Sequence, residues 1–389
     1  MGRTQGTVPT TVIADPSRTI VSVYSALVMS SKNARILYND KFSIHELIMA
    51  MAPLPLVMDR IRRDNLNPTE MANLLTPLFD DMDVNKFGIR PSPRYIKSIL
   101  LQFLKMNDNE KECNDELASF LSEVMCHNNG GKSGGRFGSS IADPEEIAHV
   151  SYKWEKSDDV KKSLTFKIFP YHNDVGVRKI WEAGACLAEF LMEYPSHVAG
   201  KNVVELGAGI GLTGMIAYVK GANSVHLSDY TDACLHNLHY NIKINSSLLS
   251  DYKRTQASIT SDYLDWCECS KNISDCSSVD LKSQTSLDAL ANADVVLAAD
   301  VVYDRKVIPG LVKVVKYIMS TSKKVYAIIA TTFRNEVTFE LFEKELRKHN
   351  CTFSYVDPQI ISSLPVVFPC YFTQGRDEVR ISLVTNDKC

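Results

Sequence analysis

The stretch VVELGAGIGLTG, from Val203 to Gly214, satisfies two glycine-rich nucleotide-binding patterns. From Gly209 it follows G-x-G-x-x-G, the dinucleotide pattern, and from Glu205 it follows E-x-G-x-G-x-G, which S-adenosylmethionine enzymes place after their first strand. In both patterns glycines let the backbone turn tightly near a ligand, at the start of a helix whose amides favour anionic or polar groups. The glycines alone therefore leave hydride transfer and methyl transfer open.

Other acidic residues bear on that choice. Asp229 does not decide it, because an acid at the end of the second strand can accept the ribose hydroxyls of either cofactor. Glu205 favours methyl transfer, because a carboxylate there can hold the loop or face a sulfonium, whereas an NAD fingerprint ordinarily keeps an apolar residue. Asp300 and Tyr303 end the strand ADVVLAADVVYD, on the edge where doubly wound sheets bind ligands. Together with a terminal strand hairpin, these residues predict a methyltransferase.

An alternation of helices and strands must position these residues. Beyond Trp181 the pattern predicts an α/β fold, a seven-strand Rossmann-like methyltransferase sheet with helices on both faces. The expected helices include 183–194, one from 212 and 307–319, and the expected strands include 202–206, 224–230, one ending at 264–266, 293–300 and 325–333. Two last strands, CTFSYV and EVRISLVT, should form an antiparallel hairpin with no helix between them.

The chain divides into three parts. Residues 1–126 are expected to form a smaller helical N-terminal domain, a candidate for substrate recognition, and a Gly- and Ser-rich linker at 127–142 separates it from a methyltransferase domain at 143–389. Two segments of the first domain repeat apolar residues at helical spacing: Ile96, Ile99, Leu100, Phe103 and Leu104, then Leu117, Phe120, Leu121, Val124 and Met125. The runs HVSYKWE and SLTFKIFPY predict a hairpin, and residues 267–292 an extended polar insertion.

Composition narrows the function classes. The 389 residues carry a formal net charge of −3 with both signs interspersed, so direct nucleic-acid binding is not expected. The longest apolar run, Leu47 to Met58, is too short to span a membrane, and the N-terminus lacks a secretory signal. The cysteines are expected to be free thiols, because the Cys267 and Cys269 pair lacks the partners of a zinc site. These features predict a cytoplasmic protein, a monomer without a metal.

The motifs together resemble the small seven-strand (class I) methyltransferases that modify lysines of proteins. They are WEAG at 181–184, ELGAGIGLTG at 205–214, SD at 228–229, LDW at 264–266 and AADVVY at 298–303. The resemblance covers residues from about 145 to the end. Within the family, the chain most resembles the members that modify eukaryotic elongation factor 2. Three further segments also resemble the pattern of those members: YIKSILLQFLKMND, DELASFLSEVM and FRNEVTFELFEKEL.

This resemblance implies S-adenosylmethionine as the cofactor and a role for each motif residue. Trp181 would pack on the cofactor at the mouth of the site, Asp229 would bind the ribose, and Ala299 would let the cofactor lie against the fourth strand. Asp265 would accept the adenine amino group while Trp266 flanks the ring. The remaining implied cofactor-binding residues are Glu205, Gly207, Ala208, Gly209 and Gly211.

Structural alternatives accompany these roles. Either tryptophan could belong to the core, the glycines could form only a tight turn, and Asp229 could be a helix N-cap. Asp265 could be a turn residue, and Asp300 with Tyr303 could cap a strand end.

The implied reaction is an in-line attack of a neutral lysine amine on the methyl group of the sulfonium. An ammonium has no lone pair, so the lysine, whose pKa in water is about 10.4, must first lose its proton, and desolvation beside a positive charge favours that loss. Asp300 would orient the amine and Tyr303 would shape its channel, so alignment would provide most of the rate gain.

The implied partner is elongation factor 2 or a similar folded protein. Three alternatives stay open: another protein substrate, a non-catalytic S-adenosylmethionine-binding interaction module, and an NAD-dependent oxidoreductase.

Overall fold

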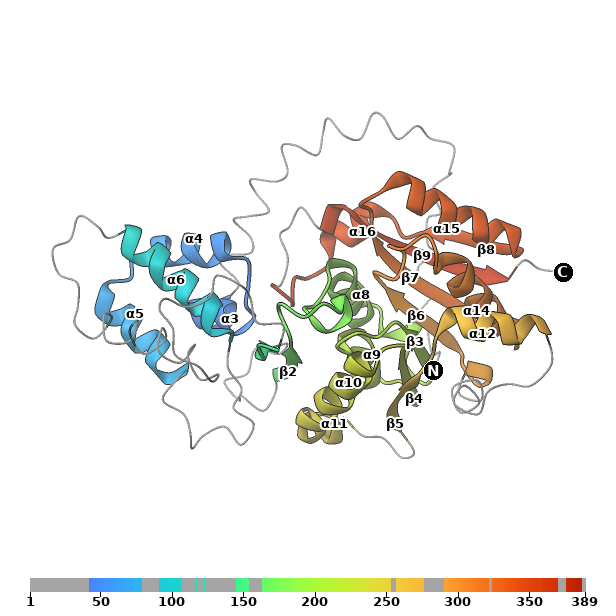
Figure 1. The fold of residues 1–389 in the computed structure, drawn as a ribbon, viewed down its shortest axis with the longest axis horizontal. Helices are drawn as coiled ribbons and strands as arrows, with labels where there is room; N and C mark the ends of the chain where they lie inside the picture. Colours follow the sequence, from blue (N-terminus) through green and yellow to red (C-terminus); the bar gives the residue numbers. More distant parts are fainter. Residues whose placement is uncertain are drawn as a thin grey trace, which may run out of the picture.

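The computed structural model describes residues 42–78, 91–106, 117, 122, 145–153, 163–252, 257–275, 290–321, 324–369 and 376–386. Figure 1 shows two units along the longest axis, a helical unit in blue to cyan and a larger α/β unit in green to red. The predicted linker, 127–142, and most of the second predicted helix, 117–125, lie outside the described residues. The domain boundaries therefore stay a prediction.

The helical unit has a hydrophobic core of its own. It contains α3 (Ile44–Met49), α4 (Leu54–Asp64), α5 (Pro68–Leu75), the 3-10 helix η2 (Thr76–Leu78) and α6 (Pro93–Met106). Capping boxes at Ser43 and Asn67 start α3 and α5. In each box the cap side chain accepts a hydrogen bond from the backbone N–H of the glutamate three residues later, and the side chain of that glutamate accepts one from the backbone N–H of the cap residue. The apolar face predicted between Ile96 and Leu104 lies on α6 and faces this core.

Specific contacts join the helical unit to the α/β unit. Helix α3 packs on β1 (Ala148–Lys153), and Ala50 at the end of α3 belongs to the larger unit's core. Arg94 Nε lies 2.9 Å from Glu146 Oε2, and its guanidinium carbon lies 5.2 Å from the centre of the Tyr171 ring. The helical unit is thus attached through both apolar and charged contacts.

Strands β1 and β2 (Ser163–Ile168) form the predicted antiparallel hairpin. The edge of β2 faces α10 (Asp232–Ile244), whose asparagines 237, 241 and 245, the last at the C-cap, recur every four residues. Asn241 Oδ1 accepts a hydrogen bond from Lys167 N at 2.8 Å, and Asn245 Oδ1 accepts one from Thr165 N at 2.9 Å. Asn245 Nδ2 and Asn237 Nδ2 donate to the carbonyls of Thr165 and Lys167. We call these three side chains the asparagine ladder.

A seven-strand, mostly parallel sheet forms the centre of the α/β unit, as predicted. Its strand order is β5-β4-β3-β6-β7-β9-β8, and β9 is antiparallel to both of its neighbours. The strands are β3 (Asn202–Leu206), β4 (Ser224–Asp229), β5 (Ser258–Tyr263), β6 (Val295–Ala299), β7 (Tyr326–Thr332), β8 (Cys351–Tyr355) and β9 (Val379–Asn386). The α helices of this unit besides α10 are α8 (Glu182–Glu193), α9 (Leu212–Val219), α11 (Ser246–Asp251), α12 (Trp266–Asp275), α14 (Ile308–Thr321), α15 (Glu336–Lys348) and α16 (Pro358–Ser363), and the 3-10 helices are η4 (Val175–Val177) and η5 (Pro195–His197).

Helices cover both faces of the sheet. Val203 and Val225 pack with α8 and α9 on one face, whereas Val204 and Val296 pack with α14 and α15 on the other. The alternation follows from the strand pleat, and burial on both faces explains why the central strands β6 and β7 are almost entirely apolar. The two helix layers leave the carboxyl ends of the parallel strands at one edge (Figure 1).

One sequence prediction was wrong. Helix α16 lies between β8 and β9, where no helix was expected; Asp357 caps it and Pro358 occupies its first turn. Helix α12 occupies the first part of the segment 267–292, which the sequence indicated as a polar insertion, and buries Cys269 and Ser270.

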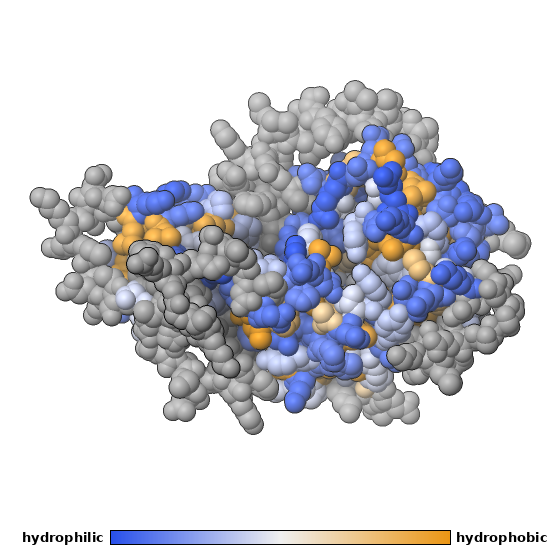
Figure 2. All heavy atoms as spheres, viewed as in Figure 1, coloured by the Kyte–Doolittle hydropathy of each residue, from blue (hydrophilic) through white to orange (hydrophobic). Residues whose placement is uncertain are grey.

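The surface is mixed in polarity. On the face shown in Figure 2, hydrophobic residues gather in one patch on the helical unit and otherwise lie in small patches among hydrophilic ones. Among the helices that the structure describes, none is both long and apolar enough to cross a membrane.

Candidate active site

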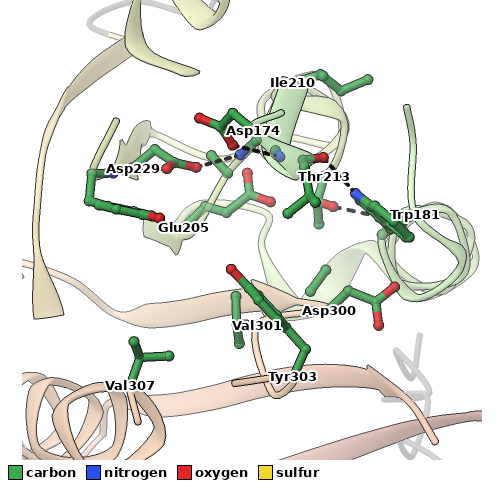
Figure 3. Close-up of a pocket in the computed structure, with 18 of the residues that line it drawn as sticks. Asp174, Trp181, Glu205, Ile210, Thr213, Asp229, Asp300, Val301, Tyr303 and Val307 are labelled. Carbon is green, nitrogen blue, oxygen red and sulfur yellow. Dashed lines mark hydrogen bonds between the residues drawn. The ribbon is translucent and has the colours of Figure 1, made fainter. Parts of the chain in front are cut away.

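A cavity of about 350 Å³ lies at the carboxyl ends of the parallel strands. Its lining contains all but one of the residues singled out in the sequence: Trp181, Glu205, Gly207, Ala208, Gly209, Asp229, Asp265, Trp266, Ala299, Asp300 and Tyr303. Figure 3 shows Asp174, Asp229 and Glu205 on one side of this cavity and Trp181 with Asp300 on another. The residues singled out in the sequence therefore come together at one cavity. The role of each residue has to be inferred from its contacts in the structure.

Gly211 is the one of these residues that does not line the cavity, and it shapes the backbone turn before α9 instead. It is the N-cap of α9 with a φ of 93°, and a Cβ there would lie 2.9 Å from Leu238 Cδ2. Gly207 and Gly209 also have positive φ, and a Cβ on Gly207 would lie 2.8 Å from Val301 Cγ1. A side chain at either position would be strained, so the turn from β3 to α9 requires glycine to stay close against its neighbours.

Glu205 lies beneath this turn rather than at the open side of the cavity. Its Oε2 accepts a hydrogen bond from Gly214 N at 2.8 Å, and the residue is only 2% exposed. Burial raises the pKa of Glu205 to about 8, despite the opposing hydrogen bond. Of the two roles considered for it, holding the loop is the one these contacts support.

Glu205→Gln is expected to flatten the pH dependence of stability. Because the folded-state pKa of about 8 lies above the ordinary glutamate value of 4.5, Glu205 stabilises the fold fully below about pH 4.5, and this contribution is lost as pH rises through about 8. Each pKa unit corresponds to about 1.4 kcal/mol. Urea unfolding of the cofactor-free protein from about pH 5 to about pH 9 measures the loss. The exposed Glu340→Gln should keep the wild-type slope, and an unchanged slope in Glu205→Gln would contradict the assignment.

Asp229 and Asp174 form the acidic side of the cavity. Asp229 Oδ2 accepts a hydrogen bond from Gly209 N at 3.0 Å and Oδ1 accepts one from Tyr230 N at 2.8 Å, and burial raises the pKa of its carboxyl. Asp174, which no sequence motif indicated, accepts from Gly176 N at 2.9 Å and from the Thr231 hydroxyl. The Asp-x-Gly spacing in HNDVGV is the turn signal that could have revealed it.

Asp300 is held by the protein itself. Oδ1 accepts a hydrogen bond from Thr332 N at 2.9 Å, and Oδ2 accepts from Ala183 N and from Thr332 Oγ1, each at 3.0 Å. In Figure 3 the carboxylate points away from Tyr303. It joins the start of α8 to the end of β7, so the geometry favours a positioning role over the direct contact with the substrate amine that the sequence suggested.

Tyr303 lies at the mouth of the cavity. It is 54% exposed, and Figure 3 shows its hydroxyl pointing into the cavity toward the side of Glu205 and Asp229. Partial burial, with the nearby Tyr230 and Asp229, raises the pKa of Tyr303 to about 12. The phenol therefore stays protonated at neutral pH and can donate a hydrogen bond, but it cannot serve as a base.

The two tryptophans lie on different sides of the cavity lining. Trp181 is the N-cap residue of α8, and its Nε1 donates to Val175 O at 3.1 Å. Trp266 begins α12, which Asp265 caps by accepting a hydrogen bond from Cys267 N at 2.6 Å. Trp266 Nε1 is a buried donor without a hydrogen-bond acceptor among the described residues. Such a donor in a cavity wall suits a ligand that brings an acceptor.

No group of three or more histidine, cysteine, aspartate and glutamate side chains in the described part of the chain is arranged to hold a metal. Cys267 and Cys269 are free thiols. What the cavity offers is carboxylates, glycine backbone and aromatic rings, the groups that suit a polar nucleoside ligand.

Comparison with known proteins shows what this chain is similar to. A family profile described as lysine methyltransferase matches residues 160–347. The protein-lysine N-methyltransferase EEF2KMT of Bos taurus is 30% identical over 275 residues, which cover 66% of this chain and 72% of that protein. An uncharacterised protein of Dictyostelium discoideum is 28% identical over 221 residues, 56% of this chain and 61% of its own length. The protein N-terminal and lysine N-methyltransferase efm7 of Aspergillus fumigatus is 26% identical over 224 residues, 54% of this chain and 80% of that protein.

Proposed function

This chain belongs to the lysine methyltransferase family, and we propose that it transfers a methyl group from S-adenosylmethionine to a lysine side chain of translation elongation factor 2. Family membership resolves the ambiguity of the glycine motif in favour of methyl transfer over hydride transfer. The observation that carries the narrower substrate is the length and identity of the similarity to EEF2KMT, 30% over 275 residues, compared with 26% over 224 residues for efm7.

The residues of the cavity fit this cofactor. Asp229 lies at the end of β4, where its buried carboxylate can accept ribose hydroxyls, and the glycine turn leaves room beside β3. The unsatisfied Trp266 Nε1 can donate to a nucleoside acceptor, while the carboxylates lining the cavity favour a ligand with a positive centre. When bound, S-adenosylmethionine supplies an electrophilic methyl group on a sulfonium.

The chain's own residues then align the incoming lysine. Tyr303 stays protonated at the mouth, where its hydroxyl can hydrogen-bond the amine, and Asp300 holds α8 and its Trp181 in place. The described residues lining the cavity include no histidine, and each of the carboxylates Asp229 and Asp300 accepts backbone hydrogen bonds. We infer that the target lysine loses its proton to water as it enters, so that alignment provides the main rate gain.

Incubation with labelled S-adenosylmethionine and a cell lysate tests the proposal. The expected result is one labelled protein, identified by mass spectrometry as elongation factor 2, with the label on a lysine. Replacement of that lysine by arginine in purified elongation factor 2 should remove the label. Label on RNA or on a different protein would contradict the substrate, and S-adenosylmethionine binding without any transfer would indicate a non-catalytic interaction module.

A further inference from the structure

The charges around the cavity are unevenly distributed. Its described lining carries six carboxyl groups, one of them the buried Glu205, and two cations, Lys179 and Arg334. Asp174, Asp229 and Asp265 lie near the ends of β4 and β5, whereas Arg334 follows β7. Because the strand order is β5-β4-β3-β6-β7, the acidic end and the Arg334 end of the cavity are three to four strand spacings apart.

Lys179 and Arg334 meet on one aromatic ring. The ammonium nitrogen of Lys179 lies 4.4 Å and the guanidinium carbon of Arg334 lies 5.3 Å from the centre of the Trp181 ring. Glu182 holds both cations, with Oε1 at 3.0 Å from Lys179 Nζ and Oε2 at 2.7 Å from Arg334 Nη2. Glu182 therefore pairs with both cations, and Asp300 Oδ2 also lies 3.8 Å from Arg334 Nη2.

The start of α8 adds donors at the same place. Trp181, its N-cap residue, supplies no side-chain acceptor to the helix, and Asp300 accepts from one of its amides, Ala183 N. Gly184 lines the cavity in the first turn of this 12-residue helix. Helix N-termini favour anions, so this end of the cavity combines backbone donors with a guanidinium.

Given S-adenosylmethionine as the donor of the proposed reaction, its two halves need opposite ends of this cavity. If Asp229 accepts the ribose hydroxyls, the part of the cavity left for the methionine half lies along the glycine turn after β3, toward α8 and β7. Its α-carboxylate would be repelled by the acidic end and needs a cation when it leaves water. We propose that Arg334, supported by Lys179 and the start of α8, binds the α-carboxylate of the methionine half and so selects the donor by that group.

The test compares S-adenosylmethionine with decarboxylated S-adenosylmethionine, which lacks only this carboxylate, by isothermal titration calorimetry. The wild-type protein should bind the complete donor about 10-fold or more tightly than the decarboxylated one, as expected for charged hydrogen bonds. Arg334→Ala should weaken binding of the complete donor about 10-fold while changing that of the decarboxylated donor less than about twofold, so the preference is lost. Arg334→Lys should keep part of the preference, since a point charge remains without the planar fork.

Arg347→Ala is the matched control, because this arginine on α15 pairs with Glu343 at 2.8 Å and does not line the cavity. It should leave both affinities unchanged. Equal weakening of both ligands by Arg334→Ala would show that the arginine only supports Trp181, and no weakening would show that the carboxylate binds elsewhere; either result overturns the inference. The proposed protein substrate is tested separately, because these binding measurements contain no elongation factor 2.

Discussion

Asp229→Ala is expected to weaken S-adenosylmethionine binding about 100-fold, the larger of the binding effects that we predict. The substitution removes the proposed ribose acceptor and the two hydrogen bonds, to Gly209 N and Tyr230 N, that fix the glycine turn against β4. Calorimetry with the purified variant measures the loss. The fold should survive, since the backbone turn is also held by the hydrogen bond from Ala208 N to Ser228 O at 2.9 Å.

Asp262→Ala provides the comparison for Asp229→Ala. Asp262 on the neighbouring β5 also accepts a hydrogen bond from the next amide, Tyr263 N at 3.1 Å, but it does not line the cavity. Its replacement should change the affinity less than about twofold. If Asp229→Ala bound the cofactor as tightly as Asp262→Ala does, the ribose assignment would fail.

Asp300→Ala is expected to lower both the stability and the rate of methyl transfer. Three hydrogen bonds to a carboxylate are lost, those from Thr332 N, Thr332 Oγ1 and Ala183 N, and two of these donors are backbone amides. We expect a loss of about 3 kcal/mol in the free energy of unfolding and about a 100-fold lower rate, because α8 and β7 are no longer held together at the cavity. Urea unfolding and single-turnover methyl transfer measure the two effects.

The joint loss separates a positioning role of Asp300 from direct contact with the lysine amine. A side chain that did not hold α8 and β7 together would lower the rate with stability changed by less than about 0.5 kcal/mol. Asp304→Ala serves as the stability control, because Asp304 also lines the cavity but accepts a hydrogen bond at the surface, from Lys306 N. A wild-type stability in Asp300→Ala would restore the direct role.

The sequence was sufficient for the sheet and for the location of the site. The strand 202–206 precedes the glycine turn and the strand 224–229 lies between two helical periods, and parallel strands place their carboxyl ends together whatever the details of the helices. Glycines 207, 209 and 211 have positive φ, so the motif directly reflects backbone geometry. Residue types tied to backbone geometry or to strand ends are therefore predictable from spacing alone.

The roles of individual carboxylates were less predictable. Asp300 ends its strand as expected, but its partners Ala183 and Thr332 are 117 and 32 residues away in sequence. Arg334 follows β7 in the segment FRNEVTFELFEKEL, which resembles the family pattern but did not indicate a role for it, and Asp174 joins the cavity through the loop before α8, which carries no recognised motif. Packing between distant segments decides which donor forms a hydrogen bond with a given carboxylate. Local sequence patterns contain no information about these partners.

The asparagine ladder has a consequence for association between molecules. A two-stranded hairpin normally leaves an open edge that can recruit a strand from another chain. Here the edge of β2 is already occupied by amides that imitate a neighbouring strand, through Asn241 and Asn245. Replacing Asn241 and Asn245 with alanine would remove these amides and reopen the edge, so the purified double variant should aggregate more readily than the wild type.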